Sequence, residues 1–451
     1  MEQKSTSMSL WSRGSGSAAV IAILALVCSF PAYTVASVAY TETKGPFRNW
    51  TQVVDLEQDG DLDVLVSHTR WEDVDLSWIG VGRWINQGDG TFQLVREQTT
   101  ERFAGFAGGA GDIDQDGDAD VFVQNFEIRL LVNQGDGTFR QNSGIDAPSS
   151  LGQSYRDKGG TITMGDLNGD GRLDALITGC CYGRNPAKPG SFYHAPSITW
   201  VWLNDGRENF YQTGHILPMD LLDGVPIREA ALGDVDGDGD LDAFAAVGRP
   251  TMGSVDSWDD QLLLNDGTGK LTPFDQSLGN TDSTSVALGD VNGDGKLDAL
   301  VGTSEGARLW INQAGKTDQG EAILAPAEQS FAATRTLGNR LQDVLSAAAG
   351  QWLGFYLPYG SLRTKAVSLS DLDGDGDLDA LIAGLREAVI WWNDGTGGFQ
   401  RSQVRFRYPE NTGVAVADFD RDGDQDLFTG SDKTNHQTWW NNGTGTFHSG
   451  R

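Results

Sequence analysis

The stretch Val286–Gly302, with the sequence VALGDVNGDGKLDALVG, contains the pattern that decides the fold prediction. Its centre, Asp290–Asp298, is an acidic nonapeptide of the form D-x-(D/N/E)-x-D-G-x-x-D. Short apolar segments rich in Val, Leu and Ala flank the nonapeptide, and such segments favour β-strands. The stretch therefore predicts two strands joined by an acidic loop.

The nonapeptide occurs seven times, and we number the copies loops 1 to 7 in chain order. They are Asp55–Asp63, Asp112–Asp120, Asp166–Asp174, Asp234–Asp242, Asp290–Asp298, Asp371–Asp379 and Asp418–Asp426. A second motif, W/L-x-N-x-G-x-G-x-F, follows each loop, with its asparagine at Asn86, Asn133, Asn204, Asn265, Asn312, Asn393 and Asn441. Two copies depart from the motif: Glu208 replaces the second glycine in one, and the other loses the spacing after Gln313. Paired motifs that recur in this way indicate a repeat protein.

Each repeat contains enough residues for four strands. The segment that ends at the asparagine is apolar, the Gly-rich turn after it is typical of a hairpin, and the Phe opens a further strand. The chain after residue 39 provides about 59 residues per repeat, the size of a four-stranded propeller blade. We therefore predict an all-β fold, a seven-bladed β-propeller of four-stranded blades over residues 46–448. The alternative is a linear array of loop repeats.

Composition limits the classes of partner. The 451 residues include 33 Lys and Arg against 63 Asp and Glu, a formal net charge of -30. Nucleic acids and anionic membrane surfaces attract clustered positive charge, so neither is expected as a partner. The seven loops contain 31 of the 63 acidic residues. Because carboxylates at such density repel one another, we expect each loop to bind a cation that balances the charge.

Calcium is the cation that the loops suit best. Calcium takes six to eight hard oxygen ligands, which carboxylates at loop positions 1, 3, 5 and 9 and a main-chain carbonyl at position 7 can supply, while Gly at position 6 permits a sharp turn. An EF-hand is excluded because position 12 is Val, Ile, Ala or Thr. We predict up to seven calcium ions, mainly structural. The predicted ligands are Asp55, Glu57, Asp59, Asp61, Asp63, Asp112, Asp114, Asp116, Asp118, Asp120, Asp166, Asn168, Asp170, Arg172, Asp174, Asp234, Asp236, Asp238, Asp240, Asp242, Asp290, Asn292, Asp294, Lys296, Asp298, Asp371, Asp373, Asp375, Asp377, Asp379, Asp418, Asp420, Asp422, Asp424 and Asp426.

Stretches such as Val286–Gly295 and Leu372–Asp379 resemble FG-GAP/VCBS repeats of the integrin alpha N-terminal type. The resemblance covers residues 46–448. It implies a seven-bladed propeller with calcium in the loop between the first two strands of each blade, and the same ligand positions. The Phe-Gly and Gly-Ala-Pro signature that names the family survives only in fragments such as Phe106–Ala110. Family members serve adhesion, carbohydrate binding and enzyme scaffolding, so the resemblance leaves the function open.

Residues 1–39 have the features of an export signal. Lys4 and Arg13 precede the apolar run Ala18–Phe30, and small residues follow, so we expect cleavage after Ala36 or Ala39. The alternative is an uncleaved membrane anchor. We expect the mature chain outside the cytoplasm, as a secreted, periplasmic or cell-surface protein, with no membrane insertion after signal cleavage.

Two insertions interrupt the repeats. Residues 179–197 contain aromatic and basic residues that could form a ligand rim or a plain elongated hairpin. Their Cys180 and Cys181 could form a vicinal disulfide or remain two thiols. Residues 314–365 include Ala325–Leu353, where apolar residues fall at roughly helical spacing. This segment could contact a partner or cap the propeller.

No catalytic motif is evident in the sequence. None of the five histidines falls in a metal-ligand pair or beside a nucleophile motif, and no phosphate loop or dinucleotide fingerprint occurs. We predict no catalytic residue and no cofactor besides calcium. The predicted function is a binding or adhesion module for an extracellular protein or glycan. The alternatives are a calcium-dependent enzyme acting on polysaccharide or phosphate esters at an axial pocket, and a purely structural surface protein.

Overall fold

The structure is a computed structural model, and every residue that it describes belongs to the unit Val35–Arg451. The described residues begin at residue 50, so the predicted signal peptide, residues 1–39, lies outside them. They are residues 50–68, 80–95, 107–124, 128–142, 161–178, 182–184, 192–194, 199–213, 227–248, 259–279, 282–304, 306–313, 324–327, 364–384, 386–408, 413–430 and 436–450.

The described strands form seven four-stranded antiparallel sheets and one two-stranded hairpin. We call the sheets blades 1 to 7 in chain order. Blade 1 consists of β1 (Trp50–Val54), β2 (Asp63–His68), β3 (Gly80–Asn86) and β4 (Phe92–Val95). Blade 2 consists of β5 (Ala107–Gly111), β6 (Asp120–Gln124), β7 (Ile128–Asn133) and β8 (Phe139–Gln141). Blade 3 consists of β9 (Ile162–Gly165), β10 (Asp174–Thr178), β13 (Thr199–Asn204) and β14 (Phe210–Gln212).

Blades 4 to 7 repeat the same order of strands without interruption. Blade 4 consists of β15 (Ile227–Gly233), β16 (Asp242–Val247), β17 (Gln261–Asn265) and β18 (Leu271–Pro273). Blade 5 consists of β19 (Ser283–Gly289), β20 (Asp298–Thr303), β21 (Gly306–Asn312) and β22 (Leu324–Pro326). Blade 6 consists of β23 (Ala366–Ser370), β24 (Asp379–Ala383), β25 (Glu387–Asn393) and β26 (Phe399–Arg407). Blade 7 consists of β27 (Gly413–Ala417), β28 (Asp426–Gly430), β29 (His436–Trp440) and β30 (His448–Ser449).

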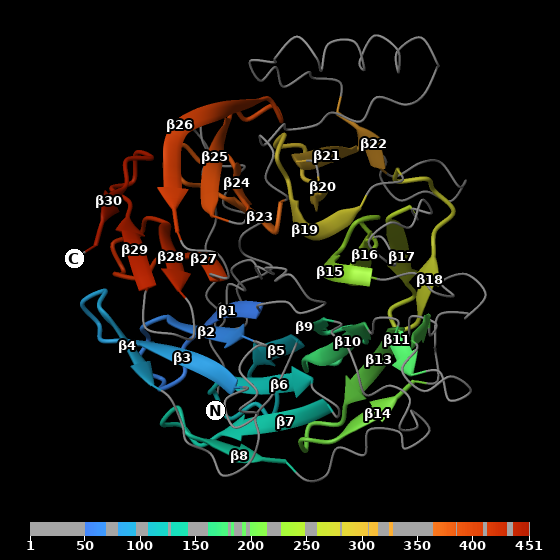
Figure 1. Cartoon of the computed structure of the whole chain (residues 1–451). Coiled ribbons are helices and arrows are strands. Elements are labelled where there is room, and N and C mark those ends of the chain that lie inside the picture. Colours follow the sequence, from blue (N-terminus) through green and yellow to red (C-terminus); the bar gives the residue numbers. More distant parts are fainter. Residues whose placement is uncertain are drawn as a thin grey trace, which may run out of the picture. The chain divides into compact units, whose positions relative to one another are not determined.

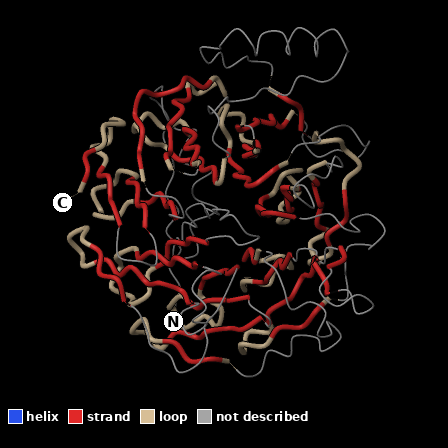
Figure 2. The backbone as a smooth tube through the Cα atoms, in the orientation of Figure 1, coloured by secondary structure: helices blue, strands red, loops and turns tan. Residues whose placement is uncertain are grey.

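The prediction of an all-β, seven-bladed propeller is confirmed. The described residues contain strands, turns and loops, and Figure 2 shows no helix among them. Consistently, no helix long and apolar enough to cross a lipid bilayer occurs in the part of the chain that the structure describes.

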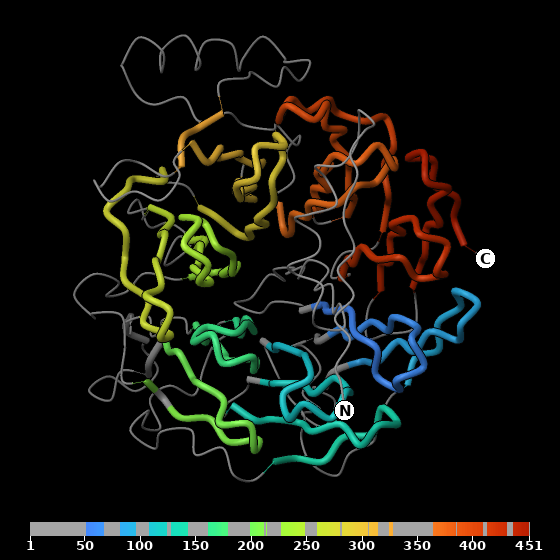
Figure 3. Tube along the Cα trace, turned by 180° about the vertical axis from the view of Figure 1, so that it is seen from behind, coloured from blue at the N-terminus to red at the C-terminus, as the bar shows by residue number. Residues whose placement is uncertain are grey.

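The blades form a closed ring. The first strand of each blade contacts the first strand of the next, from β1 through β5, β9, β15, β19 and β23 to β27. The contact between β27 and β1 completes the circle, and Figures 1 and 3 show the first strands around the centre with the last strands at the rim. The four strands of every blade come from one stretch of the chain, so the ring closes by side-to-side packing of blades 7 and 1 rather than by a strand shared between the two chain ends.

A hydrophobic cluster fills each boundary between neighbouring blades. The Trp or Leu two residues before each conserved asparagine is buried in these clusters, as Trp84 is between blades 7 and 1. Loop position 2 is buried as well, since Leu56 packs between blades 1 and 2 and Phe419 between blades 7 and 1. The sheets thus bury both faces against their neighbours, which explains why both positions are apolar in all seven repeats.

Both insertions are partly described. Residues 179–197 include an antiparallel hairpin of β11 (Tyr182–Arg184) and β12 (Phe192–His194), between the second and third strands of blade 3. Residues 314–365 include β22, the fourth strand of blade 5. Cys180 and Cys181, and residues 328–353 of the region with roughly helical spacing, lie outside the described residues.

Candidate metal centres in the acidic loops

The seven acidic loops lie on one face of the propeller. Each loop joins the first strand of a blade to the second, and the connection after each conserved asparagine joins the third strand to the fourth. Because the strands are antiparallel, both connections emerge at the same end of the blade. The remaining connections, including the hairpin β11–β12, therefore start and end at the opposite face.

A common set of hydrogen bonds folds each loop around the side chain at position 1. In loop 5, both oxygens of Asp290 accept backbone hydrogen bonds, including one of 2.7 Å from the N–H of Gly295 at position 6. The same bond from position 6 to position 1 occurs in all seven loops. The position 5 carboxylate likewise accepts the N–H of position 7 in every loop. The side chains at positions 1 and 5 therefore hold the turn of each loop through backbone hydrogen bonds.

The carboxylate at position 9 joins each loop to the second motif of its own blade. Asp379 is 1% exposed, and its Oδ2 accepts the N–H of Leu372 at 2.9 Å while its Oδ1 accepts the N–H of Asn393 at 2.8 Å. Equivalent pairs of bonds occur in the other six blades. The contact explains why every loop is followed by its own copy of the second motif, although 13 to 30 residues separate position 9 from the asparagine.

The asparagine of the second motif joins each blade to the preceding one. The Nδ2 of Asn393 donates to the carbonyl of Val291 in blade 5 at 2.7 Å and to that of Leu378 in its own loop at 3.0 Å. All seven asparagines make the bond across the blade boundary, at 2.7 or 2.8 Å. Their structural role was missed in the sequence, although the unbroken repetition of Asn was a signal for it.

Burial raises the pKa of every position 9 carboxyl, although the two backbone N–H donors lower it in part. The pKa rises to about 9 for Asp63, about 8 for Asp120, and about 7 for Asp379 and Asp426. Burial, and then the carboxylates of Asp116 and Asp114, raise the pKa of Asp118 to about 6. Negative charge in these loops is therefore costly unless a cation balances it.

Four loops bring three carboxylate oxygens within 4.8 Å of one another. They are loops 2, 4, 6 and 7, through Asp112, Asp114 and Asp116; Asp234, Asp236 and Asp242; Asp371, Asp373 and Asp379; and Asp418, Asp420 and Asp426. Several buried oxygens there, among them Oδ1 of Asp112, Asp114, Asp373 and Asp418, accept no hydrogen bond from any described residue. Clustered hard oxygens with free lone pairs are the donor set that calcium requires, so these residues fit the ion.

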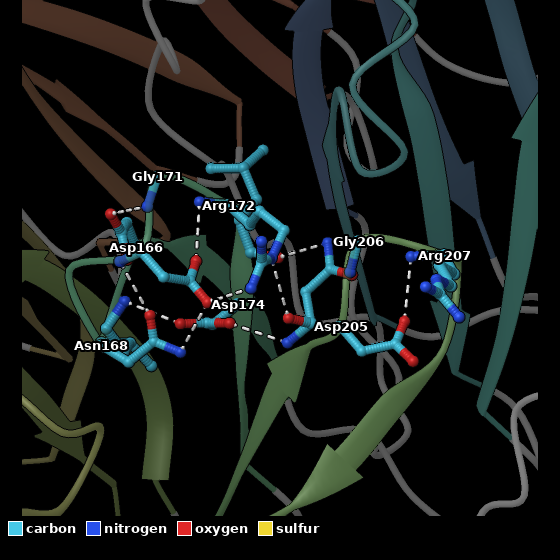
Figure 4. A network of polar contacts seen from close by, with 12 residues as sticks. Asp166, Asn168, Gly171, Arg172, Asp174, Asp205, Gly206 and Arg207 are labelled. Atoms are coloured by element: carbon cyan, nitrogen blue, oxygen red, sulfur yellow. Dashed lines mark hydrogen bonds and ion pairs between the residues drawn. The ribbon is translucent and has the colours of Figure 1, made fainter.

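Loops 3 and 5 have a different charge balance, since each has Asn at position 3 and a cation at position 7. In loop 3, Nη2 of Arg172 lies 2.6 Å from Oδ2 of Asp170, and this oxygen also accepts a hydrogen bond of 3.1 Å from the side-chain amide of Asn168. Figure 4 shows Asn168 and Arg172 in this loop. In loop 5, Nζ of Lys296 lies 3.7 Å from Oδ2 of Asp294. Within the described residues, neither loop 3 nor loop 5 brings three carboxylate oxygens within 4.8 Å of one another.

Loop 1 contains five carboxylates and also forms no such group. Its position 3 residue is Glu57, whose buried Oε2 accepts no hydrogen bond from the described residues. The Oε1 of Glu57 lies beside Gly137 of blade 2, and a Cβ added to that glycine would be 3.0 Å from it. At position 7, Oδ1 of Asp61 lies 2.9 Å from Nη2 of Arg421, which belongs to loop 7. A side-chain cation from the neighbouring blade thus already contacts this loop.

Glu208, which interrupts the second motif of blade 3, has a role across a blade boundary. Its carboxylate forms an ion pair with Arg140 of blade 2, and its carbonyl accepts the amide of Asn142 at 2.7 Å. Its φ of 58° preserves the left-handed turn that glycine provides in the other blades. Glu208 therefore replaces the glycine of the motif with a residue that connects blades 2 and 3.

The comparisons with known proteins agree with this architecture. The FG-GAP-like repeat family matches residues 55–123, 248–301 and 371–429, and the FG-GAP repeat family matches residues 283–324. No curated protein matches the sequence.

Three solved structures illustrate the range of similar chains. A lectin of Agrocybe aegerita, described for recognition of non-reducing terminal N-acetylglucosamine, is 15% identical over 89% of this chain and 97% of its own, with a TM-score of 0.49. The periplasmic gluconolactonase of Pseudomonas aeruginosa is 12% identical over 83% of this chain and 97% of its own, with a TM-score of 0.42. The Tc holotoxin pore of Photorhabdus luminescens is 18% identical over 95% of this chain but only 18% of its own, with a TM-score of 0.38.

The matched segments contain loops 1, 2, 5, 6 and 7, and they lie in a closed ring of seven blades. This chain is an FG-GAP repeat β-propeller.

Proposed function

We propose that this propeller binds calcium ions in its acidic loops. The observation that carries the proposal is the convergence of carboxylate oxygens in loops 2, 4, 6 and 7, together with buried oxygens that accept no hydrogen bond from the described residues. When bound, calcium supplies the positive charge and the oxygen coordination that these carboxylates lack. Position 1 and position 9 are both anchored by backbone N–H groups, which hold their carboxylates in place for an ion.

The proposed role of the ions is structural. Position 9 contacts the asparagine that bonds to the preceding blade, so an ion at the loop would stabilise the blade boundary as well as the loop. Because the unfolded chain lacks the assembled ligand set, calcium would favour the folded state by mass action. The stabilisation should therefore grow with calcium concentration.

We further propose that the chain is exported and serves as a binding or adhesion module for an extracellular protein or glycan. The face opposite the acidic loops supports this proposal, because most of the longer connections start and end there, including the one that contains β11 and β12. Loops of variable length on a rigid scaffold are where binding functions concentrate. Calcium sites of extracellular modules have Kd values of about 10⁻⁴–10⁻³ M, which suits an environment rich in calcium.

The test is a binding screen of residues 40–451 against glycans and surface proteins, in calcium and in chelator, with a melting curve for each condition. We expect calcium to raise the melting temperature and to permit saturable binding to one ligand class. A chain whose melting temperature does not respond to calcium would contradict the metal sites. A calcium-stabilised chain that binds neither glycan nor protein would contradict the adhesion role alone.

A further inference from the structure

The boundary between blades 7 and 1 differs from the other six blade boundaries in the charges of its acidic loops. Five of the seven loops have carboxylates at all of positions 1, 3, 5, 7 and 9. Four of these five bring three acidic oxygens within 4.8 Å, and within the described residues loop 1 is the one that does not. The number of carboxylates in loop 1 therefore does not explain the difference. Loop 1 differs in having Glu57 at position 3 and in receiving a cation from loop 7.

Arg421 makes three contacts with loop 1 from position 4 of loop 7. Its Nη2 lies 2.9 Å from Oδ1 of Asp61 and donates to the carbonyl of Asp59 at 2.9 Å, and its Nε donates to the carbonyl of Gly60 at 3.0 Å. The planar guanidinium thus spans the acidic turn with donors in a fixed geometry, which a lysine could not match. Its backbone is left-handed, with a φ of 62°, a conformation that is uncommon outside glycine.

A residue at position 4 reaches the next blade in another loop as well. In loop 2, the Nε2 of Gln115 donates to the carbonyl of Gly171 in loop 3 at 2.9 Å, from a backbone with a φ of 64°. Loops 3 to 6 have glycine at position 4. Only at the boundary between blades 7 and 1 does position 4 bring a positive charge, and it contacts a carboxylate there.

We propose that the guanidinium of Arg421 supplies at loop 1 the positive charge that calcium supplies in loops 2, 4, 6 and 7, so that closure of the ring does not require a metal ion. The proposal rests on the proposed calcium sites. Blades 7 and 1 are the only neighbours that no chain segment connects, since they contain the last and first strands of the ring. A closure made of side chains keeps these blades together at calcium concentrations that leave the other loops unloaded.

Calcium stoichiometry tests the proposal. Equilibrium dialysis with calcium would be carried out on the full chain, on Asp55→Asn/Asp59→Asn in loop 1, and on the matched variant Asp371→Asn/Asp375→Asn in loop 6. We expect the loop 6 variant to bind one ion fewer than the unmodified chain and the loop 1 variant to bind the same number. Loss of one ion from the loop 1 variant would overturn the inference. Absence of calcium binding by the unmodified chain would overturn the proposed function instead.

A second variant keeps the test valid if the double substitution in loop 1 fails to fold. Arg421→Gln removes the charge but keeps a residue that adopts the same backbone at Gln58 and Gln115, with φ of 56° and 64°. We expect it to lower the melting temperature by about 2 °C, in chelator and in calcium alike. Arg407→Gln, at an exposed position of β26, is the matched control and should cause no shift. If calcium fully restored the melting temperature of Arg421→Gln, a metal ion could replace the guanidinium at loop 1, and the inference would be overturned.

Discussion

The side-chain amide of Asn86 in blade 1 donates a hydrogen bond of 2.7 Å to the backbone carbonyl of Phe419 in blade 7. The two residues are 333 positions apart in the sequence, yet the bond is the same one that joins every other pair of neighbouring blades. Phe419 also packs in the hydrophobic cluster between these blades, together with Trp84. The ring is thus closed by the chemistry that its repeats use internally.

Replacing Asn86 should weaken that closure. Asn86→Ala leaves the buried carbonyl of Phe419 without its donor, so the free energy of unfolding should fall by about 1–3 kcal/mol. Gln93→Ala, at an exposed position of β4 in the same blade, is the control. Urea denaturation of both variants measures the difference, and equal stabilities would show that the bond contributes nothing to closure.

The position 9 carboxylate should not tolerate its amide. In Asp379→Asn, one acceptor oxygen becomes an NH₂ group that faces a backbone N–H, of either Leu372 or Asn393. We expect a loss of about 1–3 kcal/mol in chelator. Asp275→Asn, an exposed substitution outside the loops, should leave the free energy of unfolding unchanged. The account of position 9 fails if the two variants unfold at the same denaturant concentration.

Stability without metal should fall as the pH rises. Burial raises the pKa of Asp63 to about 9 and those of Asp379 and Asp426 to about 7. Because the unfolded carboxyls ionise near pH 4, their favourable contribution is complete below that pH and is lost as the pH rises through the folded pKa values. In chelator, the melting temperature should therefore be lower at about pH 8.5 than at about pH 5.5.

Calcium should reverse this dependence on pH, since it binds the ionised carboxylates. The increase in melting temperature on adding calcium should then be larger at about pH 8.5 than at about pH 5.5. Calorimetry with and without calcium at both pH values measures it. An increase that is the same at both would mean that the titrating carboxyls are not metal ligands.

Two glycines at position 4 should differ in their tolerance of a side chain. A Cβ at Gly374 would lie 2.5 Å from the carbonyl oxygen of Gly443 in blade 7, whereas one at Gly169 would have nothing within 4 Å. Their φ angles, 77° and 71°, impose nearly the same strain on alanine. Gly374→Ala should therefore destabilise the protein by about 1–3 kcal/mol more than Gly169→Ala. Equal losses in thermal unfolding would show that blades 6 and 7 can separate at this point without cost.

The sequence was sufficient for the fold because its two motifs are anchored to each other. The bond between Asp379 and the N–H of Asn393 occurs at the equivalent positions of every blade, so each loop is paired with one turn, and the pair is visible as a repeat. The apolar segments on either side of the two motifs then predict four strands in each blade. Seven such units, each with two apolar sheet faces, have to pack against one another to be buried.

The contacts between blades could not be predicted in the same way. Position 4 looks variable in the sequence, as Gln58, Gln115, Gly374 or Arg421, because its constraint comes from whatever lies on the neighbouring blade. Only the folded ring brings Arg421 beside Asp61. The sequence also treats all seven loops as equivalent ligand sets, whereas the structure separates loops 2, 4, 6 and 7 from the other three.

The central claim is that the acidic loops are calcium sites at the boundaries between blades, and an anomalous difference map from crystals grown in calcium tests it most directly. The account predicts peaks within about 2.3–2.6 Å of the carboxylate oxygens of loops 2, 4, 6 and 7, and no peak in loop 1 beside Arg421. A map with no peak in any of those four loops, from a folded chain in millimolar calcium, would contradict it.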